Sequence, residues 1–255
     1  MNASPLKKLG SLLKYRRVFI DWRTAALMRY TGRHNPCAKR LRMRGGGALW
    51  VRPKFDTVAM GELFVAESYG ELFPASPPRR VWDIGGNIGC FAIWLLRRHP
   101  GTPITSFEPC AETFAVLANN QTEWNDQPWE IRPYGLADRD QSVAAFVPFD
   151  SYGQTSRHAQ SGIPTQLPLR NIASVWEEEG RPAIDLLKID CEGDEYEILE
   201  NLPDGLWACA KNILLEIHPR PDKSPAELKT LLETRGYRVR NGRVNPDLWL
   251  ASKAN

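Results

Sequence analysis

The chain has 255 residues, of which 42% are hydrophobic and 25% are charged, and its net charge is +3. This length suits one α/β domain with an attached N-terminal segment, and the composition excludes disordered, collagen-like and fibrous proteins. No apolar run reaches the roughly 18 residues that a membrane span needs, and Lys14, Arg16 and Arg17 interrupt the apolar stretch near the N-terminus. We therefore expect neither a membrane span nor secretion. Five cysteines without a C-x-x-C pair favour a reducing cytoplasm over a zinc site.

The charges are distributed unevenly along the chain. Residues 1–54 contain 14 of the 33 basic residues and one of the 30 acidic residues, which gives this segment a net charge of +13. The rest of the chain contains 19 basic and 29 acidic residues and has a net charge of −10. Such a basic segment is attracted to polyanions, so we expect an anionic membrane surface or an acidic partner, with nucleic acid less favoured. The alternative is a helix that lies against the acidic body of its own protein. The expected location is the cytoplasm, with the membrane periphery left open.

The N-terminal part is expected to be helical. Apolar side chains at helical spacing predict one amphipathic helix within residues 5–30, docked on the domain. They are Leu6, Leu9, Leu13, Ile20 and Leu27. Glycines at 45–47 break regular structure, and residues 56–73 are predicted to form a capping helix. A proline-rich boundary then divides a basic helical segment and cap, residues 1–76, from a domain over residues 77–255.

From residue 81 onward, strands alternate with helices, which predicts a mainly parallel α/β sheet. The expected strands are 80–84, 103–107, 130–134, 184–190 and 212–217, and the expected helices are 88–98, 111–124, 193–201 and 224–235. Strands 236–241 and 244–250, joined at Asn241-Gly242, predict an antiparallel hairpin at the end of the sheet. The Ser-, Gly-, Gln- and Pro-rich stretch 142–170 is interpreted as an irregular loop beside the active site.

The glycine-rich loop after the first strand predicts a cofactor site. It carries Asp83, Gly85, Gly86, Asn87 and Gly89. Glycines there allow a tight turn and a close approach of a ligand to the backbone. The pattern is D-x-G-x-N-x-G and not the G-x-G-x-x-G that holds a pyrophosphate on a helix N-terminus. A fixed carboxylate suits the amino group and sulfonium of S-adenosylmethionine, although a glycine turn without a ligand remains the alternative.

Two further acids complete this predicted cofactor site. Glu108 follows the second strand, 19 residues after Gly89, where an acid can accept hydrogen bonds from a ribose diol. Asp138 follows the third strand and is placed to meet the adenine amino group, although an Asp in a polar turn is common.

The fourth and fifth strands carry charges where apolar residues are expected. Lys188 and Asp190 share one face of their strand, and the same parity places Glu216 and His218 together on the next strand. If these strands are neighbours, the four groups converge at the carboxyl edge of the sheet, where ligands bind. We assign all four to the catalytic site and expect Lys188 and Glu216 to form an ion pair. Asp190, which is also expected to contact the cofactor, and His218 then remain to deprotonate an acceptor.

The same region offers an alternative chemistry. The carboxylates and the imidazole after these strands could bind a divalent ion. They belong to Asp190, Glu192, Glu195, Glu216 and His218. No firm ligand spacing supports this reading, so we assign no metal.

Several of these motifs together resemble the FkbM family of methyltransferases. The matching strings are DIGGNIG at 83–89, FEP at 107–109, LAD at 136–138, LKIDCEGDE at 187–195 and LEIH at 215–218, within roughly residues 50–220. The resemblance implies a class I, Rossmann-like methyltransferase fold, S-adenosylmethionine as methyl donor, and O-methylation of a sugar or another natural-product hydroxyl. The family usually carries a Leu-Asp pair where this chain has Asn171-Ile172, so a substrate contact at that position cannot be carried over.

The expected function is therefore O-methylation of a small-molecule or glycan acceptor, such as a saccharide, a glycolipid or a natural product. Two alternatives are an NAD-dependent oxidoreductase, which Asn87 and the terminal hairpin disfavour, and a non-catalytic cofactor-binding adaptor for a polyanionic partner. The sequence indicates neither the acceptor nor the oligomeric state.

Overall fold

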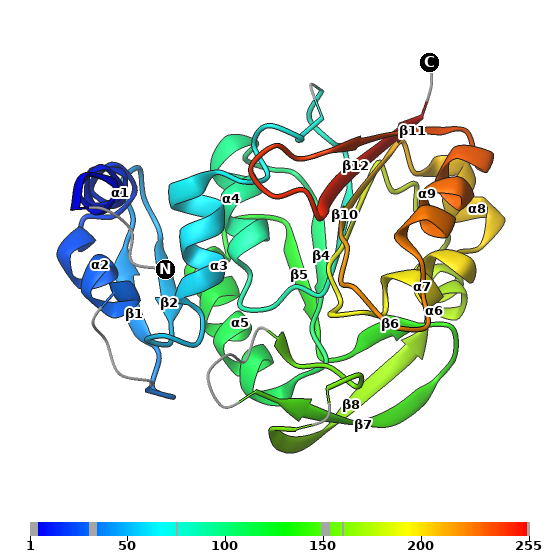
Figure 1. The fold of residues 1–255 in the computed structure, drawn as a ribbon, viewed down its shortest axis with the longest axis horizontal. Coiled ribbons are helices and arrows are strands. Elements are labelled where there is room, and N and C mark those ends of the chain that lie inside the picture. The colour runs from blue at the N-terminus through cyan, green and yellow to red at the C-terminus, as the bar shows by residue number, and fades with distance from the viewer. Residues whose placement is uncertain (1–4, 31–34, 75, 149–153, 160, 254–255) are drawn as a thin grey trace.

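The computed structural model describes residues 5–30, 35–74, 76–148, 154–159 and 161–253, with side chains from residue 12 onward. Its centre is a seven-stranded sheet in the order β11-β12-β10-β9-β3-β4-β5 (Figure 1). The parallel strands are β3 (Val81–Ile84), β4 (Ile104–Phe107), β5 (Trp129–Arg132), β9 (Leu186–Ile189) and β10 (Asn212–Glu216). The antiparallel strands are β11 (Tyr237–Asn241) and β12 (Leu248–Lys253). The predicted fold class, a parallel α/β sheet that ends in an antiparallel pair, is confirmed.

Helices cover both faces of this sheet. They are α4 (Cys90–Arg98), α5 (Ala111–Glu123), α6 (Ile172–Glu178), α7 (Glu195–Glu200), α8 (Asp204–Cys209) and α9 (Pro225–Thr234). One apolar core joins α4 and α5 to the N-terminal segment, and a second core lies beneath α6 to α9. Because both faces are covered, every residue of β3, β4 and β9 is buried, including the polar side chains of Asp83, Ser106 and Lys188.

The connection at the end of the sheet differs from the prediction. Asn241 ends β11, but β12 begins only at Leu248, so a loop over 242–247 replaces a tight turn. Glu71 accepts the backbone N–H groups of Arg243 and Val244 in this loop. The loop is thus held by a side chain far away in the sequence, which turn propensity alone does not indicate.

The single helix expected over residues 5–30 is two helices, α1 (Pro5–Val18) and α2 (Trp22–Tyr30), at one end of the molecule (Figure 1). The chain turns at Asp21, whose carboxylate accepts the Arg42 backbone N–H at 2.9 Å. The predicted apolar face is also wrong, because Leu13 is 55% exposed and Tyr15 is 1% exposed. Among the other residues of that predicted face, Ile20 and Leu27 are exposed, and the side chains of Leu6 and Leu9 lie outside the described residues.

The rest of the N-terminal segment packs tightly on the domain. Glycines 45–47 form the turn between β1 (Lys39–Arg42) and β2 (Ala48–Val51), and the capping helix is short. It consists of α3 (Thr57–Gly61) and the π-helical turn η1 (Glu62–Ala66) and ends at Glu67, whose φ is 56°. The predicted docking of this segment on the domain is confirmed, and several basic residues pair internally, as Arg40 does with Glu123. The anionic partner of the segment stays a prediction.

The stretch 142–170, interpreted as an irregular loop, contains two strands. A three-stranded sheet has the order β6-β8-β7, with β6 (Gly135–Ala137), β7 (Gln141–Val147) and β8 (Ile163–Asn171). The prediction was wrong because the residue types in these strands do not follow a polar–apolar alternation: β7 ends in five consecutive apolar residues, and Ile163 of β8 is exposed. Prolines 164 and 168 are tolerated because β6 pairs only with residues 169–171 of β8. No helix of the described residues is long and apolar enough to cross a bilayer.

A buried ion pair fixes the N-terminal segment to α5. Arg52 is 2% exposed and Asp56 is 1% exposed, and two of their N–H to oxygen distances are 2.7 and 2.8 Å. The Arg52 guanidinium also reaches the Thr113 hydroxyl on α5 at 3.3 Å. The Asp56 carboxylate therefore compensates the positive charge of Arg52, which is excluded from water.

We predict that Asp56→Ala lowers the free energy of unfolding by about 3–5 kcal/mol, because it removes the carboxylate that compensates the buried Arg52 charge. Chemical denaturation measures this change. The matched control is Glu177→Ala, which breaks an exposed pair with Arg181 at the same i,i+4 spacing and should cost less than about 1 kcal/mol. Equal losses in the two variants would show that Arg52 is not held as the structure indicates.

Candidate active site

A cleft of about 330 Å³ opens at the carboxyl ends of β3, β4, β9 and β10. The chain proceeds from β3 to β4 and β5 in one direction, whereas β9 and β10 lie on the other side of β3. The cleft therefore lies at the topological switch point, where open α/β sheets bind ligands. Two segments outside the central sheet also line it, Glu62 with its neighbours on α3 and residues 154–157 between β7 and β8. The predicted position of the stretch 142–170 beside the active site is confirmed by residues 154–157, whereas no motif indicated that Glu62 reaches the cleft.

The glycine-rich loop forms the floor of this cleft. A Cβ atom on Gly85, whose φ is 77°, would lie 1.8 Å from the Asp190 carbonyl oxygen. The two loops that follow β3 and β9 can approach this closely only with glycine at position 85. The N–H groups of Gly85 and Gly86 donate to the Phe107 carbonyl, which joins the loop to the end of β4. Gly85 and Asn87 line the cleft, whereas Gly86 and Gly89 do not.

Asp83 and Lys188 form an ion pair beneath the cleft. They are direct neighbours in the β3–β9 register, and the Lys188 Nζ to Asp83 Oδ1 distance is 3.1 Å. The same Nζ donates to the Gly85 carbonyl at 2.6 Å and lies 3.4 Å from Asp190. Burial opposes the charge on Lys188, but the carboxylates of Asp83 and Asp190 outweigh it and raise its pKa. The predicted Lys188–Glu216 ion pair is therefore wrong, and Asp83, which is 0% exposed, does not line the cleft.

Glu108 presents a largely buried carboxylate to the cleft. Its two oxygens accept the backbone N–H groups of Asn87 and Cys110, each at 2.9 Å. Burial nevertheless raises its pKa to about 7, because these hydrogen bonds compensate the lost hydration only in part. A carboxylate oxygen can accept more than one hydrogen bond, so Glu108 can still bind a hydroxyl in the cleft.

Asp138 does not face the cleft. It follows β6, which belongs to the smaller sheet, and its carboxylate lies 3.8 Å from Arg139. Leu136 of the same strand lines the cleft instead. The contact of Asp138 with adenine stays a prediction that the geometry does not support. Asn171, which departs from the family pattern, caps α6 by accepting the Ser174 N–H at 2.9 Å.

An imidazole and two carboxylates converge at the reaction end of the cleft. His218 Nδ1 lies 2.9 Å from Glu195 Oε1, and its Nε2 lies 3.5 Å from Glu192 Oε2. Burial alone would lower the pKa of His218, but the hydrogen bond with Glu195 and the charges of Asp190 and Glu192 raise it to about 10. The imidazole is therefore protonated at neutral pH. Among the described residues, the ligand atoms of Asp190, Glu192 and His218 all lie within 4.8 Å of one another, which could suit a metal ion.

Glu216 has different partners from those predicted. It accepts the Tyr69 hydroxyl at 3.1 Å and the Asn245 amide at 3.2 Å. Burial raises its pKa to about 7, and the negative charges of Asp190 and Glu62 add to that effect. Tyr69 and Glu62 both come from the N-terminal segment, and no motif indicated that they reach this edge of the sheet.

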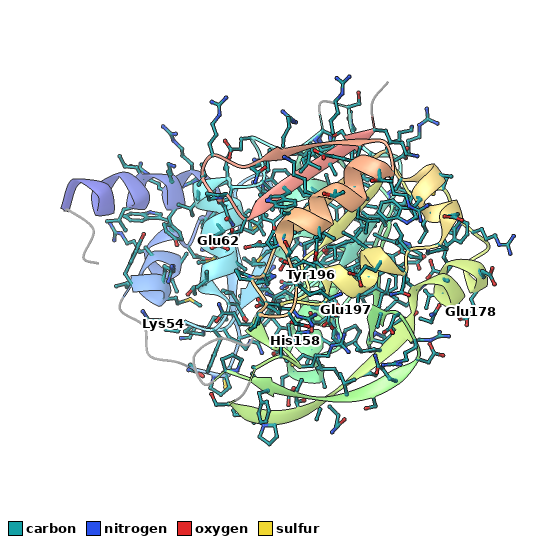
Figure 2. All side chains as sticks on the ribbon, turned by 45° about the vertical axis from the view of Figure 1, so that its right-hand side comes forward. Lys54, Glu62, His158, Glu178, Tyr196 and Glu197 are labelled. Atoms are coloured by element: carbon teal, nitrogen blue, oxygen red, sulfur yellow. The ribbon has the colours of Figure 1, made fainter. Side chains whose placement is uncertain are left out.

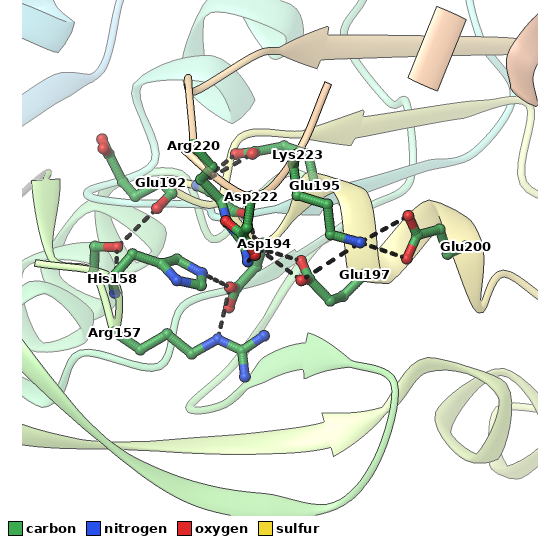
Figure 3. Close-up of polar contacts among 12 residues, drawn as sticks. Arg157, His158, Glu192, Asp194, Glu195, Glu197, Glu200, Arg220, Asp222 and Lys223 are labelled. Carbon is green, nitrogen blue, oxygen red and sulfur yellow. Dashed lines mark hydrogen bonds and ion pairs between the residues drawn. The ribbon is translucent and has the colours of Figure 1, made fainter. Parts of the chain in front are cut away.

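The segment 154–159 is fastened to the loop after β9 by polar contacts (Figure 3). The Ser156 hydroxyl donates to the Glu192 carbonyl, and Arg157 Nε and His158 Nε2 each lie 2.7 Å from Asp194 Oδ1. Figure 2 shows His158 on this segment and Glu62 on the N-terminal helices, so elements outside the central sheet form two walls of the cleft.

Comparison with known proteins agrees with this geometry. The methyltransferase FkbM domain matches residues 83–239. Methyltransferase 1 of Beauveria bassiana is 27% identical over 200 residues, which cover 70% of this chain and 79% of that protein. The 31-O-demethyl-FK506 methyltransferase FkbM of Streptomyces tacrolimicus is 26% identical over 190 residues, which cover 62% of this chain and 72% of that protein.

A solved structure supports the fold. The crystal structure of methyltransferase FkbM from Methylobacillus flagellatus superposes with a TM-score of 0.53 at 17% identity, over 77% of this chain. The match spans 53% of that longer chain. The domain match covers more than half of this sequence and includes the glycine-rich loop, Glu108 and the charged ends of β9 and β10. The chain therefore belongs to the FkbM family of methyltransferases and has the class I methyltransferase fold.

Proposed function

We propose that the chain transfers the methyl group of S-adenosylmethionine to a hydroxyl of a saccharide, a glycolipid or another natural product. The observation that carries this proposal is the meeting of three features in one cleft. These are the glycine-rich loop, the Glu108 carboxylate and the cluster around Asp190 and His218. The family membership of the chain favours methyl transfer over the oxidoreductase alternative.

The residues present fit this cofactor. Gly85 leaves the close contact between two loops free of a Cβ atom, and Glu108 offers an acceptor for a ribose diol beside it. Asp190, which is partly exposed in the cleft, replaces Asp83 as the carboxylate that can face a cationic sulfonium or amino group. In this proposal, Asp83 has an indirect role beneath the cleft: it pairs with Lys188, which in turn contacts Asp190 and the Gly85 carbonyl.

The chain must also remove a proton from the acceptor. When bound, S-adenosylmethionine supplies an activated methyl group on a positively charged sulfur. The acceptor oxygen then forms a bond to that methyl carbon as the carbon–sulfur bond breaks, and the hydroxyl proton leaves. The cluster of Asp190, Glu192 and His218 lies where carboxylate and imidazole groups can orient the hydroxyl and receive its proton. His218, with a pKa of about 10, can receive this proton only after a cation bound nearby has lowered that pKa and favoured the neutral imidazole.

We predict that the affinity for S-adenosylhomocysteine falls as the pH drops below about 7, because Glu108 then becomes protonated and no longer accepts the ribose diol as an anion. Glu108→Gln should bind roughly tenfold to hundredfold more weakly at pH 8. Its affinity should also depend less on pH. Calorimetric titration between pH 5.5 and 8.5 measures both effects. Parallel pH profiles in the two proteins would show that Glu108 does not contact the cofactor.

We predict that His218→Ala lowers methyl transfer by a factor of about 100 to 10,000 while binding of S-adenosylhomocysteine persists. Incubation of small molecules and glycans with a labelled methyl donor, followed by mass spectrometry, detects the product. Glu178→Ala is the control, since that exposed residue pairs with Arg170 and does not line the cleft (Figure 2).

Three other outcomes would contradict the proposal. Full activity in His218→Ala would place the reaction elsewhere, and binding of NADH without S-adenosylhomocysteine would favour an oxidoreductase. Cofactor binding without any methylated product would favour the adaptor.

A further inference from the structure

The acidic end of the cleft contains more carboxylates than methyl transfer alone requires. Glu62, Glu108, Asp190, Glu192 and Glu216 all line it. Among the described cations nearby, Lys188 is paired with Asp83 beneath the floor, and Arg157 is paired with Asp194 at the rim. His218 is thus left close to several carboxylates. Without a cation, these carboxylates can reduce their repulsion only by taking up protons, and burial raises the pKa of Glu192 to about 8. A bound cation would compensate their negative charge in place of those protons.

We propose that Asp190, Glu192 and His218 bind a divalent metal ion. Their ligand atoms lie within 4.8 Å of one another, and each of the three residues lines the cleft. Two carboxylates and one imidazole form a donor set that suits Mn²⁺ and related ions and leaves coordination positions for water or substrate. Metal binding does not depend on the proposed function, whereas a role of the ion in methyl transfer rests on that proposed function.

The structure sorts the five candidate ligands by their contacts. Glu195 is 0% exposed, and its carboxylate accepts the N–H groups of Cys191 at 2.7 Å and Gly193 at 3.1 Å. It also binds His218 Nδ1, so it cannot face the cleft as a ligand. Glu216 is occupied by Tyr69 and Asn245. Three residues remain, and they come from only two loops, those after β9 and β10.

Glu195 is the observation outside the three ligands that supports the site. A carboxylate that accepts a hydrogen bond from one ring nitrogen of a histidine fixes the tautomer and directs the other nitrogen toward a metal. Here Glu195 holds Nδ1, and Nε2 faces Glu192 at 3.5 Å. Two backbone N–H groups hold the Glu195 carboxylate in turn, so the orientation of the imidazole is set by the fold and not by the solvent.

The proposed ion has a defined chemical role. A hydroxyl that binds a divalent ion loses its proton more readily, because the metal stabilises the resulting alkoxide. The proton passes to water, the alkoxide oxygen bonds to the methyl carbon, and the carbon–sulfur bond breaks to give a neutral thioether. Metal binding displaces the proton from Nε2 of His218, which then acts as a ligand that positions the ion. No protein base needs to accept the hydroxyl proton directly.

Binding of Mn²⁺ to the full chain, freed of metal with a chelator and without S-adenosylmethionine, tests this site. Electron paramagnetic resonance of free Mn²⁺ should show saturable binding of one ion per chain. Glu192→Gln and His218→Gln should each weaken it by about tenfold or more. The electron spin echo of bound Mn²⁺ should show modulation from a coordinated nitrogen, and His218→Gln should remove it.

The matched control is Glu62→Gln, which removes one negative charge from the same cleft without removing a ligand. It should leave Mn²⁺ affinity within about threefold, because long-range attraction in a hydrated cleft is screened. An equal loss of Mn²⁺ affinity in Glu62→Gln and Glu192→Gln would overturn the proposal, because it would show that the ion is attracted by the overall negative charge and not held by specific ligands. The absence of saturable Mn²⁺ binding in the unmodified chain would also overturn it. Titration of the same samples with S-adenosylhomocysteine shows whether each variant is folded and reports separately on the proposed cofactor.

Discussion

The buried ion pair between Lys188 and Asp83 is the interaction on which the site depends. It joins the two central strands, β9 and β3, at the switch point of the sheet, and both side chains are almost fully excluded from solvent. Loss of either partner would leave a charge in the apolar interior, which is far more costly than loss of an exposed pair. Because Lys188 also donates to the Gly85 carbonyl, the same ammonium group fixes the loop at the floor of the cleft.

This arrangement separates charges that are buried beneath the cleft from charges that face it. Asp83 and Lys188 compensate each other below the floor, whereas Asp190, Glu192 and His218 face the cleft above it. Glu195 belongs to the buried group, but it acts on the cleft by orienting His218. The N-terminal helices add Tyr69 and Glu62 from one side, and the segment 154–157 adds a wall from another. The floor of the cleft is therefore formed by the edge of the central sheet, and its walls are formed by the N-terminal helices and the segment 154–157.

The sequence predicts the sheet more completely than it predicts the contacts of individual side chains. Alternation of apolar strands and helices indicated the parallel fold. The glycines at 85, 86 and 89 predicted a tight turn and the close approach of a ligand; the structure shows that Gly85 admits the backbone of Asp190, and the approach of a ligand stays a prediction. The alternation of side chains along a strand correctly placed Lys188 and Asp190 on one face. The order of the strands in the sheet, however, decides which carboxylate lies beside Lys188 on the neighbouring strand. Asp83 is its direct neighbour, whereas Leu214 occupies that position on β10 and Glu216 lies two residues further along. The small sheet was missed because β7 and β8 lack a polar–apolar alternation and β8 contains two prolines, a composition that resembles a loop.

The most direct measurement is a crystal structure of the chain with S-adenosylhomocysteine. We predict that the nucleoside lies against the Gly85–Gly89 loop, with a ribose hydroxyl within hydrogen-bonding distance of Glu108 and the sulfur on the side of Asp190, and that Asp83 stays paired with Lys188 below. A ligand bound outside this cleft, or one that contacts Asp83 after the Lys188 pair has opened, would contradict it.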